Sequence, residues 1–390
     1  MAADPSTTQS SPTTDLDVKE RYSAAAIESE AALCCPVSYN PEFLKAIPDE
    51  IIEKDYGCGD PSPFVNPGET VLDLGSGGGK LCYIASQIVG KAGLVIGVDY
   101  NPDMLSLARK YQEEMGIKLG FQNTDFRCGR IQDLKLNLEL LAKEWGGRPI
   151  KDHTDWVELH ELEQRLRVEQ PLVKSNSVDC VVSNCVLNLV VPEDRRQLFR
   201  EIHRILKVGG RAAISDIVSD ELVPEEMQND GHLWSGCISG AWREDDFIEE
   251  FRNAGFQGIE IAKLEAQPWQ VVNGIEFRSM TVVAYKMDDG PCLEKNQAVI
   301  YRGPFPSVMD DDGHTYPRGK RVAVCGRTFE TLMAAPFQGQ FIAVEPADKI
   351  SDADAKPFDC TTDQLRDPKV TKGATLSLPI AGCCDEDNCC

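Results

Sequence analysis

Positive charge is scarce in this chain of 390 residues. Lysine and arginine together number 40, against 63 aspartate and glutamate residues, which leaves a formal net charge of −23. A protein that binds nucleic-acid phosphates or an anionic membrane surface needs the opposite balance. We therefore expect neither nucleic acid nor membrane as a partner, and the length predicts two domains with terminal segments.

Long hydrophobic runs are also missing. The nearest candidate, Val178 to Val191, is interrupted by polar residues such as Asp179 and Asn184, so it does not predict a membrane span. Residues 1–17 have neither the basic start nor the apolar core of a secretory signal. We expect a soluble, cytoplasmic monomer in which residues 1–20 form a disordered leader.

Cysteine, in contrast, is abundant. The chain has 15 cysteines, an odd number, spread along a sequence without a secretory signal, which is not the pattern of a disulfide framework. We expect reduced thiols that serve chemistry. Cys82, Cys180 and Cys325 are exceptions, because they lie among apolar neighbours, where a free cysteine is usually a small core residue.

A glycine-rich loop follows an apolar strand in the segment Val71-Leu-Asp-Leu-Gly-Ser-Gly-Gly-Gly-Lys80. Glycines such as Gly75 and Gly77 let the backbone turn sharply and present N–H groups to a ligand at the start of the next helix. Asp73 suits a cationic amino group better than a pyrophosphate. Asp99 ends the next strand, about 20 residues on, where a ribose-hydroxyl acceptor is expected. The motif predicts a nucleotide-cofactor site; a loop that merely joins strand to helix is the alternative.

These residues resemble the class I S-adenosylmethionine (SAM)-dependent methyltransferases, as does the stretch Arg204-Ile-Leu-Lys-Val-Gly-Gly-Arg211. The alternation of strands and helices between residues 67 and 287 predicts an α/β fold, and the resemblance implies its Rossmann-like, seven-stranded, mostly parallel sheet. Strands are expected at 70–74, 94–99, 120–127, 178–184, 211–218, 256–262 and 277–285, and helices at 81–89, 102–116, 131–145, 193–206 and 244–254.

Several segments lie outside this alternation. Residues 21–66 form an N-terminal thiol-bearing segment, with helices expected at 19–33 and at 41–54, the second bent at Pro48. Residues 146–174 are a polar insertion, whose two histidines we interpret as part of a solvated helix rather than as metal ligands.

The C-terminal part has a different composition. Residues 288–350 predict a small α+β domain over the cleft, with short strands at 298–302, 321–324 and 341–344. From residue 351 the sequence is polar and predicts a tail that ends with Cys383, Cys384, Cys389 and Cys390. These four thiols either form a flexible dithiol chelator or take no part in turnover.

Three thiols stand apart from the others. Cys58 lies between two glycines, Cys185 follows a strand at the ligand edge of the expected sheet, and Cys237 follows Gly236. Flanking glycines suit a thiolate that must approach a ligand closely. Together, the three thiols have the number and kind required for one soft, three-coordinate centre.

The whole pattern resembles the arsenite methyltransferases. The matching stretches are Tyr56-Gly57-Cys58-Gly59, Asp73 to Gly79, Ser183-Asn184-Cys185, and Leu233-Trp234 through Cys237 to Ala241. The resemblance implies methyl transfer from SAM to trivalent arsenic, supplied as arsenite or its small-thiol conjugates and bound by Cys58, Cys185 and Cys237. It also implies an upstream disulfide partner, either Cys34 or Cys35, and a thioredoxin-like or glutathione-type reductant.

The resemblance implies roles in cofactor binding too. Asp73 and Gly75 would hold the methionine part of SAM and Asp99 its ribose, with Met104, Ile131 and Gln132 beside the adenine. Met104 is equally well explained as core packing. Two other functions stay open: a SAM methyltransferase for another small metabolite, and a non-catalytic, thiol-rich metalloid-binding protein.

Overall fold

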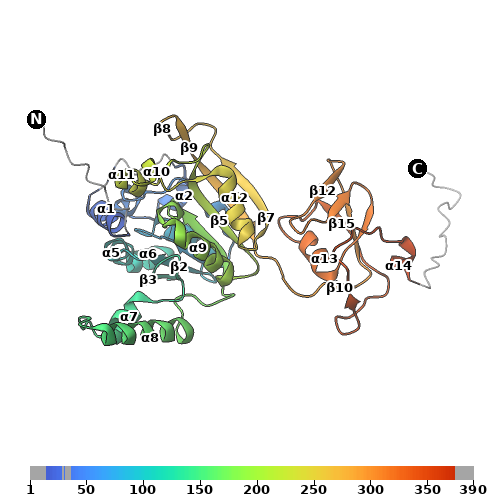
Figure 1. Cartoon of the computed structure of the whole chain (residues 1–390), viewed down its shortest axis with the longest axis horizontal. Helices are drawn as coiled ribbons and strands as arrows, with labels where there is room; N and C mark the ends of the chain where they lie inside the picture. Colours follow the sequence, from blue (N-terminus) through green and yellow to red (C-terminus); the bar gives the residue numbers. More distant parts are fainter. Residues whose placement is uncertain (1–14, 29, 31–36, 374–390) are drawn as a thin grey trace, which may run out of the picture. The chain divides into compact units, whose positions relative to one another are not determined.

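The computed structural model describes residues 15–28, 30 and 37–373. The chain divides into two compact units, Met1–Lys286 and Met287–Cys390, which are described separately below (Figure 1). None of the helices in the described ranges is long and apolar enough to cross a membrane.

Unit 1 is built on one sheet whose main strands follow the order β3-β2-β1-β4-β5-β9-β7. The strands from β3 to β5 pair in parallel, whereas β9 runs antiparallel to both β5 and β7. The expected seven-stranded, mostly parallel sheet is therefore confirmed, and two short strands, β6 and β8, are added at its side. Their bounds are β1 Thr70–Leu74, β2 Leu94–Asp99, β3 Thr124–Cys128, β4 Val178–Asn184, β5 Leu206–Ser219, β6 Trp242–Arg243, β7 Gln257–Leu264, β8 Gln270–Val272 and β9 Ile275–Tyr285.

Most of the expected helices are present, with two corrections. The helix expected at 102–116 is two helices, α5 and α6, and the one expected at 131–145 begins only at Leu138, because Asn137 caps it there by accepting a hydrogen bond from Leu140 N. The polar insertion contains a helix of 17 residues, α8, which packs on α7. The bounds are α4 Lys80–Val89, α5 Pro102–Lys110, α6 Gln112–Leu119, α7 Leu138–Trp145, α8 His153–Glu169, α9 Pro192–Ile205, α10 Glu225–Gln228, α11 Gly231–Ser235 and α12 Glu244–Asn253, with 3-10 turns at Ser62–Phe64 and Leu187–Leu189.

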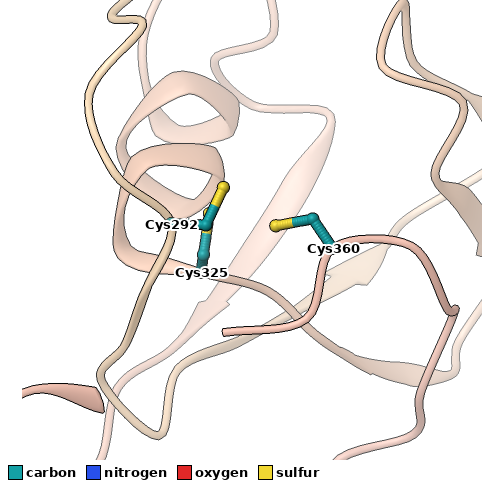
Figure 2. A group of neighbouring side chains, drawn as sticks. All are labelled: Cys292, Cys325 and Cys360. Carbon is teal, nitrogen blue, oxygen red and sulfur yellow. The ribbon is translucent and has the colours of Figure 1, made fainter. Parts of the chain in front are cut away.

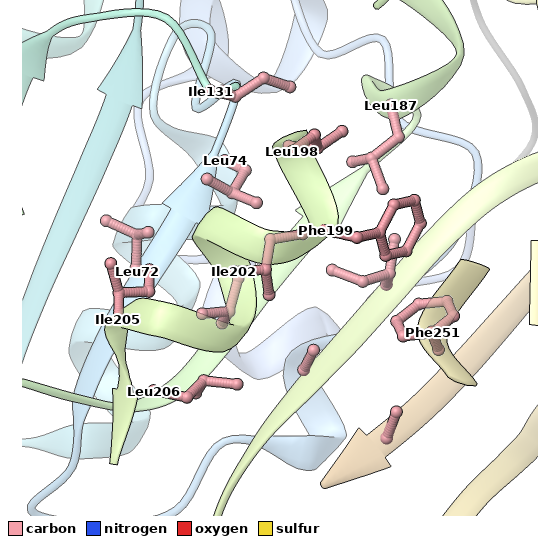
Figure 3. Packing of buried hydrophobic residues seen from close by; sticks show 14 of the residues in the cluster. Leu72, Leu74, Ile131, Leu187, Leu198, Phe199, Ile202, Ile205, Leu206 and Phe251 are labelled. Atoms are coloured by element: carbon pink, nitrogen blue, oxygen red, sulfur yellow. The ribbon is translucent and has the colours of Figure 1, made fainter. Parts of the chain in front are cut away.

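Alternate residues of each central strand enter different cores, as the two-residue period of a strand requires. Leu72 and Leu74 of β1 pack with helices α9 and α12 in one cluster, where Phe199 contacts the rings of Phe247 and Phe251. Figure 3 shows Phe199 and Phe251 in this cluster. Val71 packs with α4 and α5 in the other. Cys82 and Cys180 belong to this second cluster, which confirms them as core residues.

The N-terminal segment begins earlier than expected. Helix α1 spans Asp15–Ile27, so the expected leader does not extend to residue 20. The helix expected at 41–54 is broken into α2 (Pro41–Leu44) and α3 (Asp49–Glu53), with Pro48 at the N-cap of the second.

The described part of unit 2 contains small antiparallel sheets and two short helices. Its strands are β10 Leu293–Glu294, β11 Ala298–Tyr301, β12 Ser307–Met309, β13 Thr315–Pro317, β14 Arg321–Ala323, β15 Phe341–Val344 and β16 Lys356–Pro357, and its helices are α13 Gly326–Met333 and α14 Pro368–Lys372. Because β16 pairs with β10, the expected tail does not start at residue 351. The four terminal cysteines lie outside the described residues.

Phe199 offers a test of the α9 core. Its side chain is 1% exposed, so Phe199→Ala should lower the free energy of unfolding of unit 1 by roughly 3–5 kcal/mol through lost burial and a cavity. Val168→Ala, at a side chain 80% exposed on α8, should change it by less than about 0.5 kcal/mol. All 5 tryptophans precede residue 287, so the tryptophan fluorescence of a urea titration reports on unit 1. Equal midpoints for the two variants would contradict this packing.

Candidate functional site

The loop between β1 and α4 opens into a cleft of about 1100 Å³, its open mouth included. Gly75 and Gly77 have positive φ angles of 66° and 51°, which glycine adopts without steric cost. A side chain at position 75 would also overlap Val186. The backbone N–H of Gly77 donates to Asp99 Oδ2 over 2.9 Å, so the second predicted acid fixes the loop itself.

Three carboxyl groups line this cleft: that of Asp73 is buried, and those of Asp55 and Asp99 are partly buried. Burial raises the pKa of Asp73 to about 8, although a hydrogen bond from the thiol of Cys82 opposes the shift and the charges of Asp55 and Asp99 add to it. Burial also raises the pKa values of Asp99 and Asp55. Lys80 lies 2.8 Å from Asp55, as its ion-pair partner. The cleft is thus acidic and suits a cationic ligand.

The cofactor residues predicted from sequence converge here. Met104 is 2% exposed and packs with Ala25, Ala26 and Tyr56, yet it also reaches the cleft wall, so the two interpretations of this residue are compatible. The hydroxyl of Ser76 is buried without a hydrogen-bond partner among the described residues, which is consistent with a ligand completing the site. The predicted residues that line the cleft are Asp73, Gly75, Gly77, Asp99, Met104, Ile131 and Gln132.

The three predicted thiols meet beside this cleft. Cys58, Cys185 and Cys237 belong to one buried cluster, although they come from distant parts of the sequence. Cys58 and Cys185 sulfurs lie within 4.8 Å of each other, and the thiol of Cys237 donates to the backbone carbonyl of Cys185 over 3.3 Å. Cys185 also lines the cleft itself. The thiol cluster and the predicted cofactor residues are therefore neighbours.

Two of the thiols stand on strained backbone. Cys185 and Cys237 have φ angles of 61° and 60°, which few residues other than glycine adopt, at a typical cost of about 1–3 kcal/mol each. The buried carboxyl of Asp216 helps to hold the turn after Cys185, since it accepts hydrogen bonds from Leu187 N and Asn188 N. Burial raises the pKa of Asp216 to about 7, against the effect of these bonds.

The glycines beside Cys58 have a different role from the one expected. Cys58 is only 5% exposed, so the glycines do not uncover its thiol. They allow Asn184 and Ser215 to approach, because a side chain at Gly57 would overlap Asn184 and one at Gly59 would overlap Ser215. Asn184 Oδ1 then accepts from Cys58 N at 2.8 Å and from Gly59 N at 2.9 Å.

Cys185 and Cys237 are neutral thiols when no ligand is bound. For Cys185, a hydrogen bond with Cys237 lowers the pKa, but the neighbouring Cys58 and burial outweigh it and raise the pKa well above its ordinary value. For Cys237, the hydrogen bond with Cys185 and burial both raise the pKa. Cys185 and Cys237 are thus protonated thiols rather than thiolates.

Sequence reasoning missed several residues of the site. Tyr22 of α1 lines the cleft, and its hydroxyl lies 3.9 Å from Cys237 Sγ. Asp216 contributes a buried acid and Asp55 a partly buried one, and neither belongs to a motif that would single it out. In the sequence, Asn184 was identified only as part of the stretch Ser183-Asn184-Cys185 that resembles the arsenite methyltransferases. Cys34 and Cys35 lie outside the described residues, so no geometry connects either one with Cys58.

Gly57 provides a test of how Cys58 is held. Gly57→Ala should displace Asn184, weaken its three bonds to the Cys58 loop and so increase the alkylation rate of Cys58, measured by peptide mass spectrometry. The melting temperature should fall as well. Gly116→Ala is the matched control, because its new methyl group would lie at an ordinary 3.4 Å from the nearest atom. An unchanged rate at Cys58 would show that Asn184 does not hold the loop.

Comparisons with known proteins agree with this arrangement. A family model described as a methyltransferase domain matches residues 65–141 and 156–255, and one described as a domain of unknown function matches residues 288–376. The gap in the first match falls in and next to the polar insertion. A crystal structure of an arsenic (III) S-adenosylmethionine methyltransferase from Chlamydomonas reinhardtii is 26% identical, with a TM-score of 0.54, and the match covers 83% of this chain and all of that one.

Curated relatives extend the comparison to bacteria and mammals. An arsenite methyltransferase of Aquipseudomonas alcaligenes is 31% identical over 330 residues, which are 80% of this chain and 84% of the relative. The human arsenite methyltransferase is 30% identical over 77% of this chain and 74% of its own length. The mouse enzyme is 29% identical over 90% of this chain and 89% of its own. With a seven-stranded sheet, an acidic cofactor cleft and three converging thiols, this chain belongs to the arsenite methyltransferases, a family of SAM-dependent enzymes.

Proposed function

We propose that this enzyme transfers the methyl group of SAM to trivalent arsenic held by Cys58, Cys185 and Cys237. One observation carries the proposal: three thiols from distant segments converge in a buried cluster, and one of them lines the cleft that contains the predicted cofactor residues. Proximity of this kind is what a direct transfer between two bound ligands requires.

The residues of the cleft fit SAM. We assign Asp73 and the loop at Gly75 to the amino acid part and Asp99 to the ribose, with Met104, Ile131 and Gln132 at the adenine. Buried carboxyl groups favour a cationic ligand, and the unpaired hydroxyl of Ser76 lies in the same loop. When bound, SAM supplies an electrophilic methyl group on a positively charged sulfur.

The thiols are suited to arsenic by their chemistry. Neutral arsenous acid exchanges its three hydroxide groups for three thiols: three As–S bonds form, three As–O bonds break, and each thiol proton leaves as part of a water molecule. Sulfur is a soft ligand that a thiophilic centre prefers to oxygen. The arsenic then keeps a free lone pair, which is the nucleophile, so no general base is needed.

The electron balance requires a further step. Methylation oxidises arsenic from the trivalent to the pentavalent state. A further thiol can then attack an arsenic-bound sulfur: an S–S bond forms, the As–S bond breaks and returns its electron pair to arsenic, and the thiol proton passes to solvent. We assign this disulfide to Cys58 with Cys34 or Cys35, and its reopening to a thioredoxin-like or glutathione-type reductant by thiol exchange. A cytoplasmic location fits this chemistry, because thiols stay reduced there. The monomeric state stays a prediction.

Methyl transfer from labelled SAM to arsenite, assayed with a thiol reductant, tests the proposal directly. Methylated arsenic as the product supports it. Transfer only to other small metabolites, or arsenite binding without transfer, would favour one of the two alternative functions.

The cysteines should differ in their effects on turnover. Cys185→Ser and Cys237→Ser should abolish methylation of arsenite and of methylated arsenite, because serine replaces a soft sulfur by a hard hydroxyl. Cys58→Ser should abolish methylation of arsenite but spare methylated arsenite, which needs only two thiols. Cys180→Ser, fully buried in the second core cluster, is the matched control. Near-normal activity of Cys185→Ser on methylated arsenite would contradict the assignment.

The raised pKa of Asp73 predicts that the protein releases a proton when it binds the cofactor. Its pKa of about 8 leaves the free carboxyl mostly protonated at neutral pH, whereas pairing with an ammonium group requires the carboxylate. Affinity should therefore rise by up to about tenfold per pH unit to near pH 7, level off above about pH 8 where the carboxyl is ionised, and fall at higher pH where the ligand's amino group loses its proton. Calorimetry with S-adenosylhomocysteine, which carries the same amino group, measures this dependence.

The matched variant isolates the carboxyl group. Asp73→Asn should bind more weakly and lose the rise at low pH, while the fall at high pH persists. Asp55, Asp99 and Cys82 also face Asp73 and remain in the variant. An equal pH dependence in the two proteins would assign the proton to one of them instead.

A further inference from the structure

Unit 2 contains a second group of thiols that the methyl-transfer chemistry does not use. The sulfurs of Cys292, Cys325 and Cys360 all lie within 4.8 Å of one another. In Figure 2, the sulfur of Cys360 points toward the other two cysteines from a separate chain segment. Cys325, expected from sequence to be a simple core residue, is fully buried but lies in this group rather than in the apolar cluster of unit 2.

The fold brings these cysteines together from three segments. Cys292 immediately precedes β10, which pairs with β16, and the N–H of Phe358 donates to the carbonyl of Cys292 over 2.8 Å. This pairing leads the chain to Cys360. The third segment leaves β14 and reaches Cys325 at the N-cap of α13. Main-chain hydrogen bonds between these segments thus bring the thiols close together.

Polar groups surround the sulfurs. Cys325 Sγ accepts a hydrogen bond from Thr328 N at 3.4 Å and lies 3.2 Å from the hydroxyl of Thr328. The guanidinium of Arg327 is close enough to interact electrostatically with all three cysteines. Hydrogen-bond donors and a positive charge stabilise a thiolate, which is the form in which cysteine binds a metal or metalloid. A cysteine that only packs in a core needs neither.

Described residues offer these three sulfurs and no fourth ligand within the same distance. His314 lines a small cavity with Cys325 and Cys360, but its Nδ1 is 2.9 Å from Asp310 Oδ2. Zinc in structural sites takes four ligands in a tetrahedron. Trivalent arsenic needs only three, because its lone pair occupies the fourth direction. The set of ligands therefore favours arsenic over zinc.

We propose that Cys292, Cys325 and Cys360 form a second arsenic site, distinct from the methyl-transfer site and able to bind one trivalent arsenic through three sulfurs. Binding exchanges three As–O bonds for three As–S bonds and releases three water molecules, with no change of oxidation state. Occupied, the site cross-links three segments of unit 2, so arsenite stabilises this unit. The inference does not depend on the catalytic roles of Cys58, Cys185 or Cys237.

Thiol alkylation of the full chain tests the site. Cys292, Cys360 and Cys128 are all partly exposed, so each should react with an alkylating reagent in the absence of arsenite. With arsenite, Cys292 and Cys360 should be protected while Cys128 is not, as measured by peptide mass spectrometry. The zinc content of the purified protein is measured in parallel. Failure of protection would overturn the second site but leave the methyl-transfer proposal intact.

A variant distinguishes a three-sulfur site from simple proximity. Cys325→Ser should raise the arsenite concentration needed for half-protection of Cys292 and Cys360 by at least about tenfold, because one intramolecular ligand is lost. Cys128→Ser is the control and should leave it unchanged. Protection that does not depend on Cys325, or bound zinc that arsenite does not displace, would overturn the proposal. The same alkylation measured in Cys58→Ser should show undiminished protection, which separates this site from the first.

Discussion

The thiol cluster of unit 1 depends on the side chain of Asn184. Its amide oxygen accepts from Cys58 N and Gly59 N, while its amide nitrogen donates to Gly59 O and to Tyr39 Oη. Asn184 ends β4, so these bonds join the N-terminal segment to the ligand edge of the parallel sheet. Cys58 itself belongs to no strand of that sheet, so its place beside Cys185 rests on these side-chain bonds. The amide of Asn184 thus adds the thiol of Cys58 to those of Cys185 and Cys237.

The strained backbone at Cys185 and Cys237 and the buried carboxyl group of Asp216 lie at the same edge of the sheet. The left-handed conformations of Cys185 and Cys237 are unfavourable by themselves, and they persist because the surrounding contacts determine them. Asp216 accepts two N–H groups of the turn that follows Cys185, at the cost of being fully buried. Such departures from local preference are typical of functional sites, where neighbouring structure maintains a geometry that the isolated segment would not adopt.

Whether a feature of this fold could be predicted from the sequence depends on how far apart along the chain the interacting residues lie. Strand period and capping residues are local, so the sheet, and the position of Asp99 at the end of β2, were predicted correctly. The start of α7 was not, because the apolar pattern of 131–137 continues into a helix that Asn137 begins only later. Pairing of β10 with β16 joins segments more than 60 residues apart, and no local signal marks it. For the same reason the thiol cluster of unit 2 was invisible in the sequence.

The charges of the two neighbouring sites are complementary to what each is proposed to bind. Buried acids around the cleft suit a cation, and their pKa values rise because an isolated negative charge in this environment is unfavourable. Cys185 and Cys237 beside them are neutral for a related reason, since a thiolate next to Asp216 and the other sulfurs would add negative charge to a buried site. Neutral thiols are weaker nucleophiles than thiolates. Arsenous acid is itself neutral, however, and the exchange of its hydroxides for thiols produces a neutral complex and water. The cluster can therefore bind its substrate without burying any net charge, which leaves the acids of the cleft to balance the positive charge of the cofactor.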